Sequence, residues 1–158
     1  MFKITTKSAE DTKNCGRLTA EVLKPKDIII LEGELGAGKT TFVKGVLEGF
    51  SYKKMVLSPT FTLLRQYKVR GLAINHIDLY RIDSRGLRDL GLDEFVYQPH
   101  SLSFIEWGGK IIKNLDSFIL IEFSFLSQNE RKISFSLKGL EDKRLKDIKR
   151  KALLTASH

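Results

Sequence analysis

The sequence predicts an α/β domain in which a mixed β-sheet is flanked by helices. Short runs rich in Ile, Val, Leu and Phe alternate along the chain with longer stretches whose apolar residues recur at helical spacing. The segment Asp27–Glu32 (DIIILE) is the clearest strand, because a continuous apolar run is typical of a strand buried on both faces. Strands and helices mixed in this order favour a sheet with helices on its faces, and we expect antiparallel strands at one side.

Helix boundaries are marked by capping and breaking residues. Ser8 can cap a helix with its side chain, and Glu10 and Asp11 suit the positive end of the helix dipole. Pro25 lies just beyond the end of this first helix. The expected helices span residues 9–23, 39–48, 87–95 and 141–154.

Strands are expected wherever a short apolar or alternating run is bounded by turn residues. Two of them are joined at Arg70–Gly71, which is a plausible hairpin turn. The expected strands span residues 27–32, 55–60, 61–69, 72–78, 102–107, 118–125 and 132–137.

The composition indicates one globular domain with a basic end. Of 158 residues, 42% are hydrophobic and 29% are charged, which is a globular balance. We expect a domain over residues 1–140 and a basic helix or tail over residues 141–158. The net charge is +8, and seven basic against three acidic residues give the segment 138–151 a charge of +4. Such a segment suits a polyanion such as RNA or an acidic protein, and it is also typical of a solvated helix.

Several classes of protein are disfavoured. The longest apolar stretch, Phe118–Leu126, is interrupted by Glu122 and is too short to span a membrane. The first eleven residues lack the apolar run of a signal peptide. The single cysteine, Cys15, excludes an internal disulfide, and we expect a cytosolic location. Cys15 itself is either a packed side chain on the first helix or, alternatively, a reactive thiol.

The segment Gly33–Thr40 (GELGAGKT) fits the phosphate-binding pattern G-x-x-x-x-G-K-[ST] at every fixed position. Glycines let the backbone turn sharply and bring its N–H groups close to phosphate oxygens, and the following helix adds the positive end of its dipole. Lys39 can reach the β and γ phosphates, and the Thr40 hydroxyl can ligate Mg²⁺. A strand before the loop and a helix after it support this interpretation. The sequence therefore predicts a P-loop that binds ATP and Mg²⁺.

Two carboxylates are candidates to complete this site. Asp78 ends the run LAINHID and Glu106 ends LSFIE, so each lies where a strand meets a loop. In open α/β sheets such strand ends form the ligand crevice. One acid can bind the metal while the other orients the attacking water, and the sequence leaves open which does which.

Two neighbours of these acids are ambiguous. His76 lies two residues before Asp78 and shares its strand face, either as a structural or as a catalytic histidine. Trp107 follows Glu106 and belongs either to the core or to the site.

Taken together, the motifs resemble those of the bacterial TsaE family, also called YjeE. The resemblance covers roughly residues 8–137 and rests on four motifs in the family's order and spacing. The motifs are GELGAGKTTF (33–42), SPTFTL (58–63), HIDLYRI (76–82) and IEW (105–107). The loop alone would indicate only a P-loop protein, whereas the other three together are far more specific.

The resemblance implies a P-loop NTPase-like fold and a small ATPase that works in tRNA modification. Members of the family assist the TsaB–TsaD complex, which places a threonylcarbamoyl group on the adenosine next to the anticodon. By this likeness the chain binds ATP or ADP with Mg²⁺ and hydrolyses ATP, and it reaches tRNA indirectly through that complex.

The resemblance also assigns roles to residues. Lys39, Asp78 and Glu106 are the expected catalytic residues, and Thr40, Asp78 and Glu106 the expected metal-site residues. Trp107 is expected beside the nucleotide, and Thr12 and Arg131 at its border. The full set expected to bind the nucleotide is Thr12, Glu34, Leu35, Gly36, Ala37, Gly38, Lys39, Thr40, Thr41, Trp107 and Arg131.

Departures from the family pattern keep alternatives open. After IEW the family often has proline, an acid and arginine, whereas this chain has Gly108-Gly109-Lys110. Lys110 would lack the bidentate fork of an arginine. A small-molecule kinase is the main alternative. A kinase usually has a mobile lid rich in arginines, and the segment long enough for one, 81–100, supports this only weakly, because it holds three arginines (Arg81, Arg85 and Arg88) but also four acids. A nucleotide-gated switch is another, with SPTFTL as the element that senses the γ-phosphate.

Overall fold

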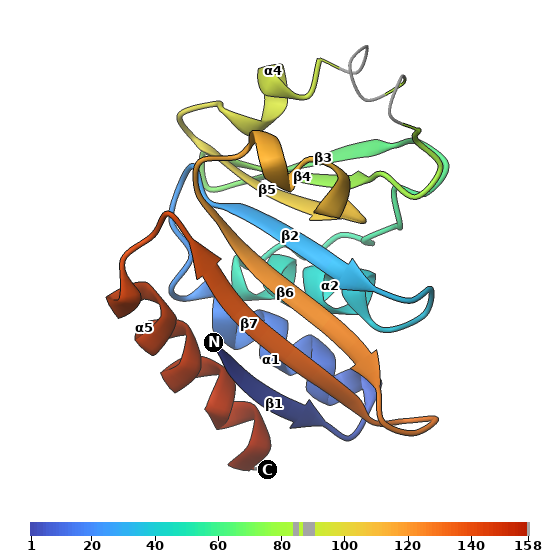
Figure 1. Ribbon diagram of the computed structural model, residues 1–158, viewed down its shortest axis with the longest axis vertical. Coiled ribbons are helices and arrows are strands. Elements are labelled where there is room, and N and C mark those ends of the chain that lie inside the picture. Colours follow the sequence, from blue (N-terminus) through green and yellow to red (C-terminus); the bar gives the residue numbers. More distant parts are fainter. Residues whose placement is uncertain (84–85, 87–90, 158) are drawn as a thin grey trace.

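A seven-stranded mixed sheet forms the centre of the molecule (Figure 1). The structure is a computed structural model that describes residues 1–83, 86 and 91–157. The strands lie side by side in the order β1-β7-β6-β2-β5-β4-β3. Their bounds are Phe2–Thr6 (β1), Ile28–Gly33 (β2), Leu64–Val69 (β3), Leu72–Asp78 (β4), Ser101–Glu106 (β5), Phe118–Phe125 (β6) and Arg131–Lys138 (β7).

The centre of the sheet is parallel and both of its edges are antiparallel. Strand β2 pairs in parallel with β5 and with β6, and β4 pairs in parallel with β5. Strand β7 is antiparallel to both β6 and β1, and β3 is antiparallel to β4. The expectation of antiparallel strands at one side only is therefore wrong, because the chain adds a hairpin at each end of the parallel group.

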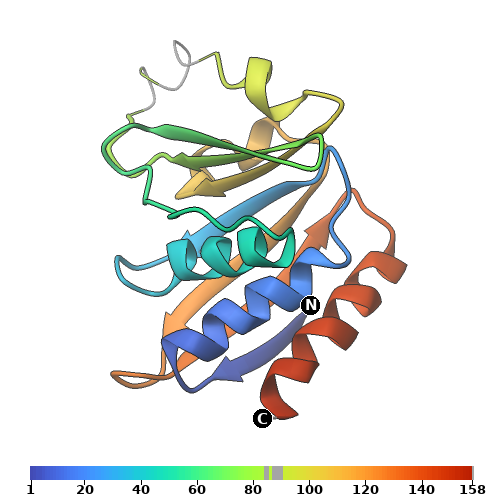
Figure 2. The same cartoon turned by 180° about the vertical axis from the view of Figure 1, so that it is seen from behind.

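Three helices cover one face of the sheet, as Figure 2 shows. Helices α1 (Ala9–Ala20) and α2 (Lys39–Gly49) lie side by side, and α5 (Asp142–Leu153) lies against α1 near β1. Smaller elements pack on the other face: α4 (Asp93–Val96) and the short turns η1 (Gly108–Lys110) and η2 (Ile112–Asn114). The turn η3 (Leu154–Ser157) follows α5. None of the helices in the described part of the chain has the length and apolar character that crossing a membrane requires.

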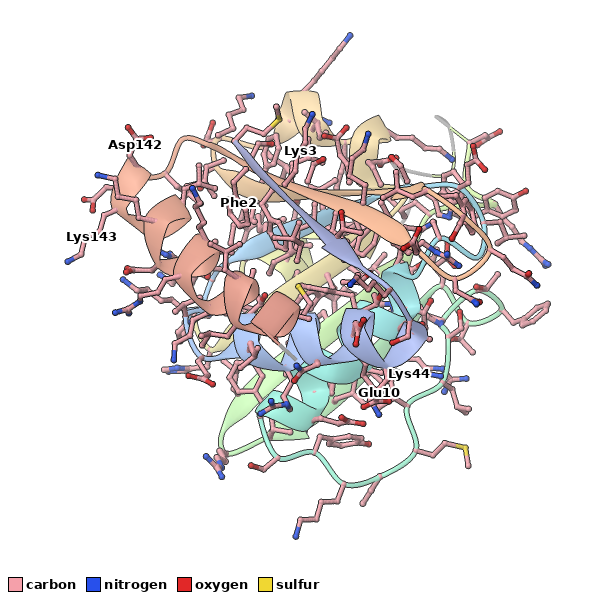
Figure 3. All side chains as sticks on the ribbon, turned by 90° about the horizontal axis from the view of Figure 1, so that it is seen from below. Phe2, Lys3, Glu10, Lys44, Asp142 and Lys143 are labelled. Atoms are coloured by element: carbon pink, nitrogen blue, oxygen red, sulfur yellow. The ribbon has the colours of Figure 1, made fainter. Side chains whose placement is uncertain are left out.

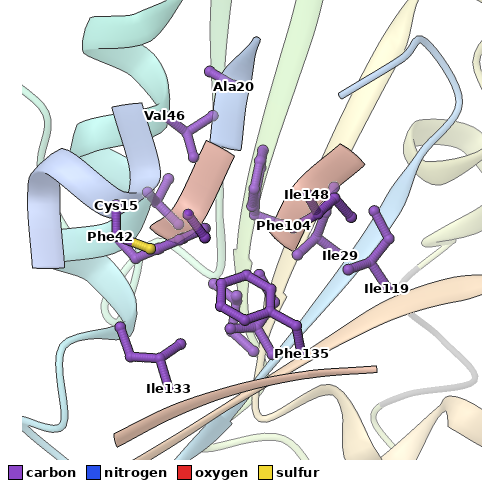
Figure 4. Packing of buried hydrophobic residues seen from close by; sticks show 14 of the residues in the cluster. Cys15, Ala20, Ile29, Phe42, Val46, Phe104, Ile119, Ile133, Phe135 and Ile148 are labelled. Atoms are coloured by element: carbon purple, nitrogen blue, oxygen red, sulfur yellow. The ribbon is translucent and has the colours of Figure 1, made fainter. Parts of the chain in front are cut away.

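Alternate residues of β2 divide the core between the two faces. Ile29 and Leu31 belong to the larger cluster under α1, α2 and α5, part of which Figure 4 shows. Ile28 and Ile30 belong to the smaller cluster on the opposite face. The continuous apolar run of DIIILE therefore has the predicted cause, burial on both sides of a central strand.

Glycines allow α1 and α2 to pack at very short range. A Cβ atom on Gly45 would lie 1.8 Å from the carbonyl oxygen of Lys13, and one on Gly16 would lie 2.1 Å from that of Phe42. Neither position has room for a side chain. This packing fixes α2, the helix whose first residue is Lys39.

Two strand predictions need correction. Residues 55–60 form an irregular loop and not a strand, and Met55 and Leu57 are exposed there. The chain turns after this loop, where the N–H groups of Thr62 and Leu63 both donate to the carbonyl of Pro59. Strand β3 consequently begins at Leu64 and not at residue 61.

One strand is missing from the prediction, and one helix differs from its predicted bounds. Strand β1 was not predicted, although Phe2, Ile4 and Thr6 are buried in strict alternation with exposed residues. Of the helix expected at residues 87–95, only residues 93–95 belong to α4, which continues to Val96. Residues 91 and 92 are not helical, and residues 87–90 lie outside the described residues.

Candidate functional site

The glycine-rich loop Gly33–Thr40 leads from the end of β2 into α2, at the carboxyl end of the parallel strands. Gly38 has a φ of 109°, a backbone conformation that suits glycine, and helix α2 begins at the next residue, Lys39. A Cβ on Gly33 would lie 2.4 Å from the carbonyl oxygen of Phe123, so this position also requires glycine. The backbone of the loop therefore curves tightly around the N-terminus of α2, a position that favours the binding of an anion.

The ammonium of Lys39 is buried at the centre of the site. Its Nζ donates to the carbonyls of Gly33, at 2.6 Å, and Glu34, at 2.9 Å. The same atom lies 4.2 Å from the ring centroid of Trp107. Burial lowers the pKa of Lys39 below its usual value, and the carboxylate of Glu106 offsets part of that effect. The loop thus holds the Lys39 ammonium in place through two of its backbone carbonyls.

Glu106 links three elements through one oxygen atom. Thr40 Oγ1 donates to Glu106 Oε1 at 2.7 Å, and His76 Nε2 lies 2.8 Å from the same oxygen. His76 is fully buried and Glu106 is 4% exposed. His76 Nδ1 is also buried and has no hydrogen-bond partner among the described residues. The carboxylate is therefore held between β4, β5 and the first turn of α2.

Asp78 lies beside Glu106, since the two residues face each other in the parallel register of β4 and β5. Thr60 Oγ1 donates to Asp78 Oδ2 at 2.6 Å, and the N–H of Tyr80 donates to Oδ1 at 2.9 Å. Ser58 Oγ lies 2.8 Å from Thr60 Oγ1. Asp78 therefore joins the loop after α2 to the end of β4.

Trp107 is held in an uncommon backbone conformation at the end of β5. Its φ is 60°, a value that few residues other than glycine adopt, and its N–H donates to the carbonyl of Leu31. Its ring packs against that of Tyr80, with 4.9 Å between centroids. The indole therefore forms a wall of the site next to Lys39, and it also touches the smaller core cluster.

These residues surround one hollow, the main cavity, at the end of the parallel strands. It is lined by Leu35, Gly36, Gly38, Lys39, Thr40, Thr41, Ser58, Thr60, Asp78, Tyr80, Glu106 and Trp107. Most of the residues expected at the site are thus brought together. Glu34 is exposed and contributes its carbonyl to Lys39, while the Ala37 side chain is buried in the core, which leaves only its backbone for a ligand.

The two residues expected at the border of the site lie together in a second hollow, the side cavity. Thr12 and Arg131 line it with the glycine loop and the first turn of α1. Sequence reasoning identified Ser8 only as a helix cap and did not single out Ala9 or Asn129; these three residues complete the side cavity. Their only signal was their closeness in sequence to Thr12 and Arg131.

The basic residues around the site are engaged by the protein itself. Lys110 Nζ donates to the carbonyls of Leu79 and Ile82, at 2.8 Å and 2.7 Å, and so holds the chain that leaves β4. Arg65 Nε donates to the carbonyl of Ser58, and Arg81 stacks on the exposed ring of Phe61. The other two arginines of the supposed kinase lid, Arg85 and Arg88, lie outside the described residues.

The oxygen-bearing side chains of the main cavity suit a hard metal cation that keeps most of its bound water. The described residues contain no group of three or more His, Cys, Asp or Glu side chains that could hold a metal alone. The hydroxyl of Thr40 and the carboxylates of Asp78 and Glu106 nevertheless are oxygen donors that a metal ion could use, and the two acids outweigh the one ammonium of Lys39. Mg²⁺ has this preference, because it is usually bound through one or two carboxylates with waters and phosphate oxygens.

The fold and the site define a mixed α/β protein with a glycine-rich loop between a central parallel strand and a helix, and acids at the ends of neighbouring strands. A model of the family described as threonylcarbamoyl adenosine biosynthesis protein TsaE matches residues 6–133. The chain belongs to the TsaE family.

Named relatives agree with this assignment. The tRNA threonylcarbamoyladenosine biosynthesis protein TsaE of Bacillus subtilis (strain 168) is 40% identical over 139 residues, which cover 87% of each chain. That of Treponema pallidum is 35% identical over 135 residues, covering 84% of this chain and 98% of the other. The crystal structure of Bacillus subtilis YdiB superposes with a TM-score of 0.78 at 33% identity and covers 94% of both chains.

Proposed function

We propose that this chain binds ATP with Mg²⁺ in the main cavity and hydrolyses ATP in support of tRNA threonylcarbamoyladenosine modification. The observation that carries the proposal is the contact of Thr40 with Glu106 beside the buried ammonium of Lys39. A cation, a hydroxyl and a carboxylate at the start of a helix form the set that binding a metal-bound triphosphate needs.

Each residue has a definite part in this proposal. Lys39 neutralises charge on the β and γ phosphates, and the amides of the glycine loop bind their oxygens. Thr40 and one of the two carboxylates, Asp78 or Glu106, would hold Mg²⁺, which when bound neutralises the charge that develops on the phosphates. The nucleoside extends toward the side cavity, where Thr12 and Arg131 border it.

Hydrolysis needs a water molecule aligned with the γ-phosphate. Asp78 and Glu106 are adjacent in register, so one carboxylate orients that water while the other serves the metal. The hydrogen bond from Thr60 to Asp78 gives the segment SPTFTL a direct connection to this step.

We further propose that turnover by the isolated chain is slow and that the TsaB–TsaD complex accelerates it. In related chemistry an arginine near the transferred phosphoryl group contributes roughly 10³ to 10⁵ in rate. Neither Arg65 nor Arg81 lines the main cavity, since Arg65 donates to the carbonyl of Ser58 and Arg81 stacks on Phe61. A partner can supply what the isolated site lacks. Work on tRNA of this kind belongs in the cytoplasm.

Steady-state phosphate release tests the proposal, measured for the chain alone and with TsaB, TsaD and tRNA added. We expect slow release that requires Mg²⁺ and rises with the complex. Fast turnover that the complex leaves unchanged would contradict the accessory role. Transfer of the γ-phosphate to an added small-molecule acceptor would instead indicate a kinase.

A further inference from the structure

The solvent face of α5 is basic and has no part in the site described above. Lys143, Lys146 and Arg150 recur at three- and four-residue spacing, so they share one face of the helix, and Lys149 adjoins them. All four side chains are exposed. In Figure 3 Lys143 points away from the body of the molecule at the outer end of α5.

The opposite face of α5 anchors the helix without these residues. Ile148 and Ala152 are fully buried in the larger core cluster. Arg144 donates from Nη1 and Nη2 to the two carboxylate oxygens of Asp27, at 3.1 Å and 2.6 Å. Lys151 pairs with Glu21 on α1. The cations that face the body of the protein, Arg144 and Lys151, are thus neutralised by acids. The four exposed cations on the solvent face are not required to hold α5 in place.

The outward cations are largely without counter-charges. Among the described residues, no carboxylate lies within 4.0 Å of Lys143, Lys146 or Lys149, and Arg150 is 3.9 Å from Asp147. The turn at residues 24–27 adds Lys24 and Lys26, both exposed, and is held beside α5 because Asp27 accepts from the backbone of Lys24 as well as from Arg144. Like charges on one surface repel each other, so this surface is complementary to a polyanion.

We propose that this basic face (Lys24, Lys26, Lys143, Lys146, Lys149 and Arg150) docks the phosphate backbone of RNA. The identity of that RNA as tRNA rests on the proposed function. Lysine is depleted at the apolar centres of protein–protein interfaces, and among the described residues no exposed large apolar side chain lies within 24–26 or 143–150. The exposed Leu153 and Leu154 lie only at the far end of the helix. Phosphate contacts of this kind carry no sequence information, so binding is independent of sequence.

The basic face is separate from the main cavity. The matching family model ends at residue 133, ahead of α5, so the four α5 residues of this face lie beyond what the family model covers, whereas Lys24 and Lys26 lie within it. In Figures 1 and 2 the loop between β2 and α2 and the helix α5 lie on opposite sides of the molecule. Substitutions on α5 therefore test RNA binding without touching the residues proposed for ATP.

The test is fluorescence anisotropy of a labelled tRNA transcript with the full chain, repeated from about 50 to 200 mM salt. The variant Lys143→Gln/Lys146→Gln/Lys149→Gln removes three cations and keeps good helix formers. We expect affinity to fall about tenfold or more, and the slope of log affinity against log salt to decrease by about 2 to 3. Unfolding curves of the variant verify that α5 stays in place.

A matched control distinguishes a local surface from net charge. The variant Lys53→Gln/Lys68→Gln/Lys113→Gln removes the same charge from exposed lysines elsewhere. It should bind tRNA within about twofold of the unaltered chain, since charges farther than about 10 Å from the bound phosphates are largely screened at these salt concentrations. Equal loss in both variants would overturn the proposal. Loss of binding to a polyglutamate peptide with tRNA binding unchanged would assign the face to an acidic protein and would also overturn it.

Failure of this proposal is distinguishable from failure of the proposed function. Phosphate release by the triple α5 variant alone should equal that of the unaltered chain. If ATP is hydrolysed but tRNA binding ignores α5, only the basic face is rejected. If tRNA binding depends on α5 but no ATP is hydrolysed, the basic face stands and the ATPase proposal is rejected.

Discussion

His76 Nε2 lies 2.8 Å from Glu106 Oε1, and the Thr40 hydroxyl donates to that same oxygen from the other side. His76 and Glu106 are both buried, so water does not compete with the contact between them. The orientation of the Glu106 carboxylate is thus set by β4 as well as by α2. This geometry favours a positioning role for His76, which the sequence left open between structure and catalysis.

Replacing His76 should weaken the function of Glu106 without removing it. Outer partners of metal-site ligands commonly contribute 10- to 100-fold, so we expect His76→Ala to lower Mg²⁺-dependent turnover about that much. Glu106→Gln should cost about 10² or more. The measurement is phosphate release as a function of Mg²⁺ concentration.

The matched control for His76 is the variant His100→Ala. His100 is exposed and precedes the first residue of β5, at the end of the strand away from Glu106, so this substitution should leave turnover unchanged. If His76 were purely structural, its replacement would lower the stability of the protein but not its apparent affinity for Mg²⁺. Partial rescue by His76→Gln, whose amide can donate to a carboxylate, is expected for a positioning residue. Unaltered turnover in His76→Ala would reject this role.

Lys39→Ala should greatly weaken ATP binding or abolish hydrolysis. The substitution removes the one buried cation of the main cavity and leaves the carbonyls of Gly33 and Glu34 without their donor. Calorimetric titration with ATP and Mg²⁺ measures the effect, and circular dichroism checks the fold. Lys44→Ala, an exposed position on the same helix, is the control. Equal affinity and turnover in Lys39→Ala and the unaltered chain would show that the loop is not the nucleotide site.

Much of the fold was predictable because strong local patterns coincide with tertiary burial. The run DIIILE became a central strand buried on both faces, and Ser8 accepts a hydrogen bond from the N–H of Asp11 as a helix cap should. The residues of the loop, Asp78 and Glu106 converge because the ends of neighbouring parallel strands must lie at one edge of the sheet.

What escaped prediction depends on partners distant in sequence. Strand β1 is short, and its pairing with β7 across more than 120 residues gives no local signal beyond alternation. Residues 55–60 look like a strand by composition, yet the sheet already has β3 at its edge and leaves them outside. The contact of Lys110 with the carbonyls of Leu79 and Ile82 was likewise invisible, since it joins two loops after different strands.

Gly45→Ala should destabilise the protein markedly. The added Cβ would lie 1.8 Å from the carbonyl oxygen of Lys13, so α1 and α2 would have to separate. Overpacking of this kind costs about 1 to 3 kcal/mol, which should appear as a lower urea midpoint. Lys44→Ala is the neighbouring control and should change stability by less than about 0.5 kcal/mol. A midpoint for Gly45→Ala equal to that of the control would show that the helices are less closely packed.

Cys15 should be unreactive in the folded protein. The side chain is fully buried, and burial raises the pKa of its thiol to about 12. Only the thiolate attacks disulfide reagents, so labelling at pH 8 should be slow when native and should reach one equivalent in denaturant. Because the unfolded thiol ionises near 9.0, the native state retains a proton that the unfolded state loses, and stability should fall as pH rises from about 9 toward 12. Rapid labelling of the native protein would favour the reactive alternative.

Trp107 provides an intrinsic probe of the main cavity, because it is the only tryptophan in the chain. Its ring lies 4.2 Å from Lys39 Nζ and 4.9 Å from the ring of Tyr80. If phosphates attract the Lys39 ammonium, the field on the indole changes, and so should the emission spectrum. We therefore expect ADP and ATP to alter the fluorescence with saturation, at concentrations that agree with calorimetry. Lys39→Ala should lose this response together with its affinity, whereas Tyr80→Phe should retain it, since the phenylalanine ring can still pack on the indole. Emission that is indifferent to saturating nucleotide would instead assign Trp107 to the core.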